Sequence, residues 1–151
     1  MEPAQPPWYL DPGLSILIGT VDAQGTPSCC RGIAIAAGDA SRLTVFVPLA
    51  TSQRVIQDAA TTHRLSVTAS HVVSHRTIQF KGRTGVVRLA RDEEAPWIRD
   101  RLRAFAESLD EVGVPWRDAL RLAHWPAFAV ELRVEETFDQ TPGPNAGCKL
   151  P

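Results

Sequence analysis

The stretch that decides the fold runs from residue 15 to residue 47 and reads SILIGTVDAQGTPSCCRGIAIAAGDASRLTVFV. It contains three runs rich in β-branched and small apolar residues, at 15–22, 27–36 and 42–47. A short segment containing glycine separates each run from the next, and such segments form tight turns. Three strands joined by short turns predict an antiparallel meander.

A short helix and two further strands follow this meander. Pro48 ends the third strand, and Thr51 or Ser52 can cap a helix that begins just after it. The next two strands are predicted at 63–70 and from residue 77 onward. Gly82 and Gly85 interrupt the second of them, which indicates a bulge or a sharp barrel corner.

Two helices precede the last strand. The longer one starts near Asp92 and repeats apolar residues at steps of four and three as far as Val112, which places them on one face. The shorter one covers 116–123, and 127–138 alternates strictly as a strand. We therefore expect a mainly β fold: a six-stranded antiparallel barrel with a short helix after strand three and a helical pair before the last strand.

The length of 151 residues fits one domain. We expect the barrel to cover residues 14–138, preceded by a proline-rich extended arm (1–13) and followed by an irregular tail (139–151). The net charge of -1 provides no field that would attract nucleic acid. No apolar run is long enough to cross a membrane, and the start does not resemble a secretory signal. An odd set of three cysteines favours a reducing, cytoplasmic setting.

The charges are unevenly distributed along the chain. The residues up to Arg91 include nine Lys and Arg against five Asp and Glu, and the remainder includes seven against twelve. This asymmetry has two interpretations: chance combined with an acidic helix, or an anion site in the first half.

Three segments could hold an anionic ligand. Residues 45–54 (VFVPLATSQR) place hydroxyls and Arg54 at a helix start, which suits a phosphate but equally describes an ordinary helix cap. Arg31 lies within a strand of small and apolar residues, where a charge needs a salt-bridge partner or a ligand. Thr77, Gln79 and Lys81 share one strand face, which either faces water or hydrogen-bonds a heterocycle.

Together these segments resemble the flavin-binding split barrels of the pyridoxamine 5'-phosphate oxidase-like family, over about residues 14–138. The resemblance rests on the strand order, the helix after the third strand, and the RTIQFKG run at 76–82. It implies a homodimer with flavin mononucleotide between the subunits and a small-molecule substrate. It also implies a small flavin-dependent oxidoreductase of unknown substrate, in which the flavin supplies the redox chemistry.

The resemblance assigns site residues position by position. Arg31 falls on an arginine that contacts the flavin mononucleotide. Phe46 and Val47 fall on a cofactor-lining Tyr-Thr pair, and Arg76 and Thr77 fall on an Arg-Gln strand start. The Ser-Arg-Lys phosphate clamp falls on Thr51-Ser52-Gln53 or, with one residue inserted, on Ser52-Gln53-Arg54. Our own hypothesis adds Gln79, which with Thr77 would face the isoalloxazine or its ribityl chain.

Several departures from the family pattern weaken the assignment of the oxidase activity itself. Ala36 replaces a basic residue, the clamp keeps at most one of its two basic residues, and the tail lacks the substrate-binding motif with its Trp and Arg-Leu-Ala-Pro ending. Two alternatives therefore remain open. One is a split barrel that binds haem or a deazaflavin. The other is a cofactor-free dimer that acts as a binding or stress-associated module.

The histidines and cysteines predict no metal site. A haem would need an axial ligand from the four histidines, which are His63, His71, His75 and His124. His71 and His75 have helical ligand spacing but flank a link between strands, without a carboxylate motif. Cys29 and Cys30 are adjacent, so in a strand they point to opposite faces and cannot form a redox pair.

Overall fold

The computed structural model describes residues 7–39 and 41–151. The strands are β1 (Leu14–Val21), β2 (Pro27–Gly32), β3 (Ala34–Ala37), β4 (Arg42–Pro48), β5 (Arg64–His71), β6 (Thr77–Leu89), β7 (Ala127–Asp139) and β8 (Cys148–Leu150). The helices are α1 (Leu49–Thr62), α2 (Ala95–Glu111) and α3 (Trp116–Ala119), with 3-10 turns η1 (Trp8–Leu10) and η2 (Asp92–Glu94).

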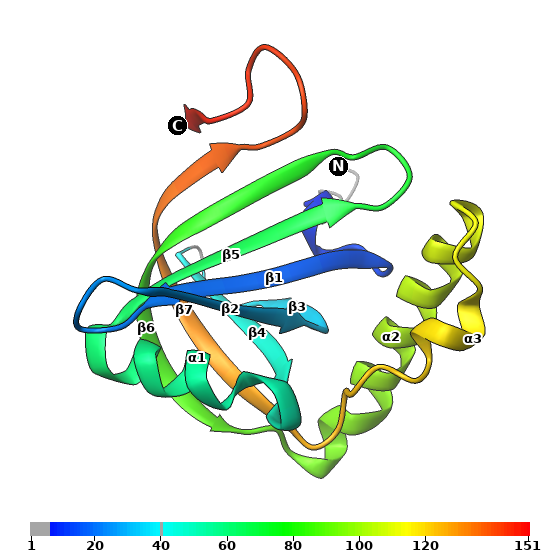
Figure 1. The fold of residues 1–151 in the computed structure, drawn as a ribbon, viewed down its shortest axis with the longest axis horizontal. Coiled ribbons are helices and arrows are strands. Elements are labelled where there is room, and N and C mark those ends of the chain that lie inside the picture. Colours follow the sequence, from blue (N-terminus) through cyan, green and yellow to red (C-terminus); the bar gives the residue numbers. More distant parts are fainter. Residues whose placement is uncertain (1–6, 40) are drawn as a thin grey trace, which may run out of the picture.

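One antiparallel sheet curls into a split barrel (Figure 1). Its strand order is β2-β1-β5-β6-β7-β4-β3, with β8 added beside β7. The two ends of this order, β2 and β3, are consecutive in the chain and form one strand that bends at Ile33. The Ile33 N–H donates to the Phe46 carbonyl at 2.8 Å. The six predicted barrel strands are therefore present, and the bend divides the second of them in two.

The ends of the chain and of the helices differ in detail from the expectation. Cys148–Leu150 pairs with β7, so the tail is less irregular than predicted. Trp8–Leu10 in the N-terminal arm forms a 3-10 turn instead of an extended segment, and residues 1–6 of the arm lie outside the described residues. Helix α1 begins at Leu49 with Pro48 as its N-cap and has no side-chain cap, so the expected capping by Thr51 or Ser52 is wrong: both lie inside the helix, and the Ser52 hydroxyl donates to the Pro48 carbonyl.

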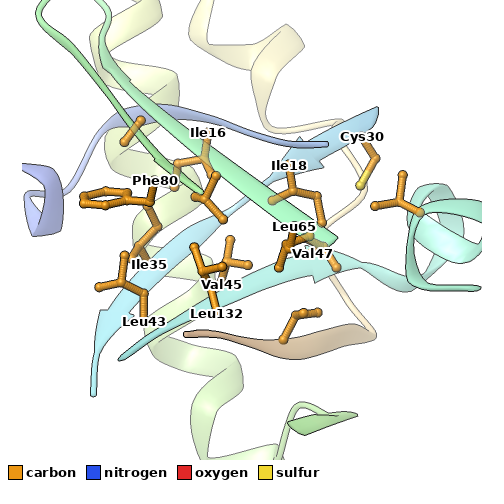
Figure 2. Close-up of a cluster of buried hydrophobic side chains, with 14 of the residues drawn as sticks. Ile16, Ile18, Cys30, Ile35, Leu43, Val45, Val47, Leu65, Phe80 and Leu132 are labelled. Carbon is orange, nitrogen blue, oxygen red and sulfur yellow. The ribbon is translucent and has the colours of Figure 1, made fainter. Parts of the chain in front are cut away.

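The barrel interior is filled by apolar side chains from every strand that lines it (Figure 2). Ile18, Val45 and Val67 are fully buried at its centre. Val55 and Ala59 of α1 pack against the same cluster. The aromatic residues of η1 also contact it, and the Tyr9 ring meets the Phe80 ring edge-on at 4.9 Å.

A second apolar cluster attaches α2 to the outside of the barrel. Ile98 and Leu102 of α2 are buried against Phe46 and the start of β7. The Phe46 ring contacts the Trp97 ring edge-on at 5.5 Å. Helix α2 therefore covers one part of the outer surface, and most of the outer face of β1, β5 and β6 stays uncovered (Figure 1).

The glycines of β6 mark bulges, as predicted. The register between β6 and β7 shifts at Lys81/Gly82 and again between Thr84 and Val87. A Cβ atom on Gly82 would overlap the Arg133 carbonyl oxygen, so only glycine allows the two strands to approach here. Within the described ranges, no helix is both long and apolar enough to cross a membrane.

Candidate cofactor-binding face

The outer face of the sheet carries two of the candidate residues, Arg31 and Gln79, in one row that crosses five strands. Directly paired residues of antiparallel strands project to the same face. Arg31 pairs with Leu17, Leu17 with Thr68, Thr68 with Gln79, and Gln79 with Phe138. With strands ~4.8 Å apart, this row spans the face from β2 to β7 in about 19 Å.

Arg31 is the most unusual member of the row. Its Nε and Nη1 atoms are buried, and neither has a hydrogen-bond partner among the described residues. The guanidinium carbon lies 4.3 Å from the centre of the Phe105 ring of α2, which covers one side of it. Burial lowers the pKa of the Arg31 guanidinium, which still remains charged at neutral pH. A buried, unpaired cation is costly, and an anion that approached Arg31 would relieve this cost.

The middle of the row is a connected set of polar groups. Gln79 Nε2 donates to Thr68 Oγ1 at 3.3 Å, and Gln140 Nε2 donates to Gln79 Oε1 at 3.2 Å. Beside them, Thr77 Oγ1 donates to Ser70 Oγ at 3.0 Å. The Gln79 amide is held in place by these bonds and keeps one N–H and one oxygen lone pair for a ligand.

A groove of about 690 Å³ continues this face toward the β1–β2 hairpin. Its floor is the next row of the sheet, in which Gly19 pairs with Cys29 and with Ser66, and Ser66 pairs with Lys81. The remaining lining residues are Thr20, Val21, Pro27, Ser28, His63, Arg64, Leu65, Gly82, Arg83, Glu135 and Glu136. Two residues along a strand span about 7 Å, so the floor of the groove lies directly beside the row that contains Arg31.

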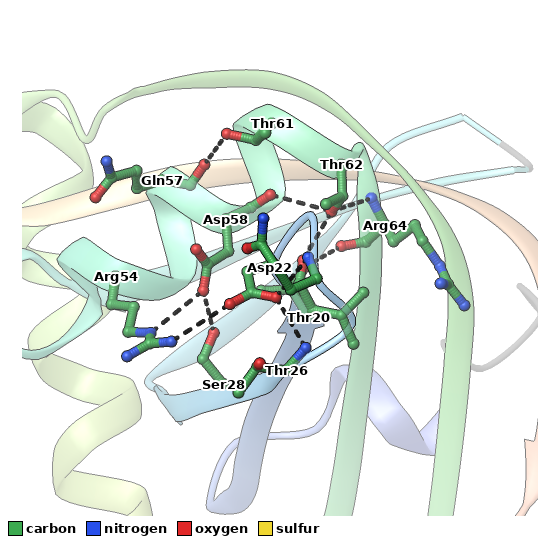
Figure 3. Close-up of polar contacts among 12 residues, drawn as sticks. Thr20, Asp22, Thr26, Ser28, Arg54, Gln57, Asp58, Thr61, Thr62 and Arg64 are labelled. Carbon is green, nitrogen blue, oxygen red and sulfur yellow. Dashed lines mark hydrogen bonds and ion pairs between the residues drawn. The ribbon is translucent and has the colours of Figure 1, made fainter.

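The structure shows internal partners for two groups of the predicted phosphate clamp. Ser52 is fully buried, and its hydroxyl donates to the Pro48 carbonyl at 2.6 Å. Arg54 is 66% exposed and lies 3.7 Å from Asp22 and 3.5 Å from Asp58 (Figure 3). A phosphate at this helix start would have to compete with two carboxylates for Arg54.

The other predicted residues are distributed over different surroundings. Thr51 and Gln53 are exposed on the first turns of α1. Phe46 lies beneath α2, and Val47 is fully buried inside the barrel. Arg76 lies over the Trp8 ring at 4.7 Å. Of the predicted set, the structure therefore brings Arg31 and Gln79 together in one row, with Thr77 beside it, and places the rest elsewhere.

Two residues around this face were not expected from the sequence. Phe105 reads as part of the apolar stripe of its helix, and nothing in that pattern indicates that it covers a guanidinium. Gln140 lies in the predicted irregular tail, and its bond to Gln79 joins residues far apart in the chain. For the contact between Phe105 and Arg31, the only signal in the sequence is an arginine within an otherwise apolar strand.

The histidines differ in their relation to the face. His63 adopts a left-handed conformation (φ 56°) at the end of α1 and lines the groove. His71 Nδ1 accepts the Ser74 N–H at 3.2 Å, and His124 Nδ1 lies 3.1 Å from the Leu122 carbonyl. Neither His71, His75 nor His124 lines the groove, so His63 is the one candidate there for an axial haem ligand.

Solved structures with the same fold exist despite low sequence identity. F420 reductase is 12% identical, with 89% of this chain and 97% of that chain covered and a TM-score of 0.54. HupZ from Group A Streptococcus is 15% identical, with 88% and 90% covered and a TM-score of 0.51. A candidate pyridoxamine 5'-phosphate oxidase from Lactobacillus delbrueckii is 18% identical, with 82% and 83% covered and a TM-score of 0.50.

These similarities establish the fold. The chain matches no protein-family model and no curated protein sequence. It has the split-barrel fold of the pyridoxamine 5'-phosphate oxidase-like proteins, as the sequence predicts. Proteins that share this fold differ in the function that their names indicate, so the site residues must carry the functional argument.

Proposed function

We propose that this protein binds flavin mononucleotide on the outer face of the sheet and acts as a small flavin-dependent oxidoreductase. The observation that carries the proposal is the buried guanidinium of Arg31, whose Nε and Nη1 have no partner among the described residues. A cofactor phosphate would supply the missing anion and accept charge-assisted hydrogen bonds from it.

The roles of the other residues follow from their positions. Gln79, fixed by Thr68 and Gln140, would hydrogen-bond the polar edge of the isoalloxazine, and Thr77 lies beside it. Thr51 and Gln53 are exposed at the start of α1 and are not part of the Arg31 row. They would contact the phosphate only from the surface of that helix. When bound, the flavin would accept and deliver electrons, and the protein residues would position it and exclude water.

Three rival ligand states lead to different spectra. A deazaflavin is favoured by the fold similarity to F420 reductase and would use the same cationic row. A haem would use His63 in the groove. A cofactor-free binding or stress-associated module would leave Arg31 without an anion. An absorbance spectrum from 300 to 700 nm, recorded before and after reconstitution, separates these states.

The decisive experiment is a titration of the reconstituted protein that follows the quenching of flavin fluorescence. Arg31→Met keeps the bulk of the side chain and removes its charge. We expect it to weaken flavin mononucleotide binding about 10- to 100-fold, the effect of losing charge-assisted hydrogen bonds. Arg99→Met, which removes an exposed arginine of the same helix that carries Phe105, is the matched control.

An unchanged affinity in Arg31→Met would remove Arg31 from the site. A wild-type spectrum that stays empty after reconstitution would reject the flavin assignment altogether. In the same proposal two copies of the chain pack through the uncovered sheet face and enclose the cofactor. A cytoplasmic location also belongs to it, since Cys29, Cys30 and Cys148 are all free.

A further inference from the structure

Two arginines face each other directly across the groove end of the sheet. Arg64 of β5 and Arg83 of β6 are paired residues in the register, so their Cβ atoms lie about 5 Å apart. Like charges placed directly opposite each other destabilise a sheet. Both side chains line the 690 Å³ groove. The two guanidinium groups cannot pair with each other, so both are open to an anion that enters the groove.

The carboxylates nearby neutralise this pair only in part. Arg83 Nε lies 3.6 Å from Glu135 Oε1, and both side chains are largely exposed, which makes the contact weak. Arg64 has no ion pair with any carboxylate that the structure describes. Figure 3 shows its guanidinium pointing away from the Asp22 and Asp58 cluster. The groove end therefore carries positive charge that remains available.

The rest of the groove suits the body of a small ligand. Gly19 and Ser66 form its floor, and a Cβ on Gly19 would already come within 3.2 Å of Ser66 Oγ. The floor is therefore low and offers only backbone and a small hydroxyl. Lys81 and Cys29 stand on either side of it in the same row. The volume is in the range that small-molecule sites occupy.

We infer that this groove binds a small organic ligand through a phosphate or pyrophosphate group held between Arg64 and Arg83. Two guanidinium groups on adjacent strands present several N–H donors, and the oxygens of one phosphate can accept from both. The ligand body lies over Gly19 and Ser66. The site is separate from Arg31 and needs no flavin, so its failure and that of the proposed cofactor site are distinguishable.

The test is isothermal titration calorimetry of the purified protein with inorganic pyrophosphate at constant ionic strength. Wild type should bind, and Arg64→Gln and Arg83→Gln should each weaken binding about 10- to 100-fold. Arg133→Gln is the matched control. Arg133 of β7 pairs with Arg83 but does not line the groove. The affinity of Arg133→Gln for pyrophosphate should stay within about twofold of wild type.

The stability of each variant is checked by thermal unfolding, and pyrophosphate should raise the midpoint of wild type but not that of Arg64→Gln. No binding to wild type, or an equal loss in Arg133→Gln, would overturn the inference. The titration is repeated with saturating flavin mononucleotide. Undiminished pyrophosphate affinity supports a separate site, whereas its complete loss would identify the groove as the seat of the cofactor phosphate and also overturn the inference.

Discussion

Arg31 combines a functional requirement with a cost to the fold. Its guanidinium is buried against Phe105, two of its nitrogens have no partner among the described residues, and burial lowers its pKa. Without a ligand, two of its guanidinium nitrogens are out of water with no hydrogen-bond acceptor, which is unfavourable. Such local destabilisation is common at binding sites and is relieved when the ligand arrives.

This cost predicts that Arg31→Met stabilises the ligand-free protein. Methionine fills the same space beside Phe105 and needs no anion. We expect the free energy of unfolding in urea to rise by about 1–2 kcal/mol at pH 7. Arg99→Met, at an exposed position, should change it by less than about 0.5 kcal/mol. A loss of stability in Arg31→Met would mean that the guanidinium is already satisfied.

At this scale the sequence could reveal some features and not others. Arg31 was recognisable because a charge in an apolar strand requires a partner or ligand. The pairing of Arg54 with Asp22 was not, because it depends on how α1 packs against the β1–β2 hairpin. The internal bond of the Ser52 hydroxyl likewise depends on where the helix begins.

At the scale of single elements, the junction between β6 and α2 is fixed by one ion pair. Arg88 Nη2 lies 2.7 Å from Glu94 Oε1, and the Arg91 N–H donates to Glu94 Oε2 at 2.7 Å. The hydrogen bond from Arg88 is the main reason that the pKa of Glu94 falls to about 2. Glu94 therefore connects the end of β6 to the start of α2, the helix that carries Phe105.

The low pKa of Glu94 predicts a pH-dependent loss in Glu94→Gln. A carboxyl whose folded-state pKa lies below the ordinary 4.5 stabilises the fold above pH 4.5 and loses this effect as the pH falls toward 2. The Glu94 side chain is 22% exposed, so we expect a modest loss of about 1 kcal/mol in unfolding free energy at pH 7.

Urea unfolding at pH 7 and at pH 2.5 measures this difference. The gap between wild type and Glu94→Gln should shrink strongly at the lower pH, because pH 2.5 lies well below the ordinary pKa of 4.5 and close to the folded-state pKa of about 2, where the ionised carboxylate adds little to stability. Glu93→Gln, at an exposed neighbouring position, should show no gap at either pH. A gap that is constant with pH would mean that packing, and not ionisation, accounts for the effect of Glu94.

The elements themselves were largely predictable. Alternation located β5 and β7 to within a residue, and the glycines indicated the bulges of β6. Strand β8 was not predictable, because three exposed residues carry no periodicity and form a strand only beside β7. The division of β2 from β3 at Ile33 also follows from barrel closure, a long-range requirement that no local pattern encodes.

At the scale of the whole molecule, the uncovered sheet face is the surface that a second copy would occupy. Leu17 is 51% exposed in the middle of the Arg31 row, between a buried cation and a polar ladder. In the dimer proposal a second subunit would cover this leucine. Covering it would also enclose the ligand that Arg31 requires, which joins the cofactor proposal to the dimer proposal.

Leu17→Asp is expected to separate such a dimer. A carboxylate buried in the interface without a partner costs about 3 kcal/mol or more, so the dissociation constant should rise at least about 100-fold. Size-exclusion chromatography with light scattering gives the mass directly. Leu89→Asp is the control. It changes an exposed leucine at the last position of β6, and this variant should stay dimeric. A wild-type monomer would contradict the dimer.

The pairing of β4 with β7 has a consequence for how the chain reaches this structure. Val45 of β4 can pair with Val130 only after three α-helices and two further strands have been made. On the ribosome, β4 therefore emerges with one side of its pairing missing. Contacts so distant in the chain slow folding, and unpaired edges invite association with other nascent chains. Newly made copies are therefore open to such association until β7 has emerged.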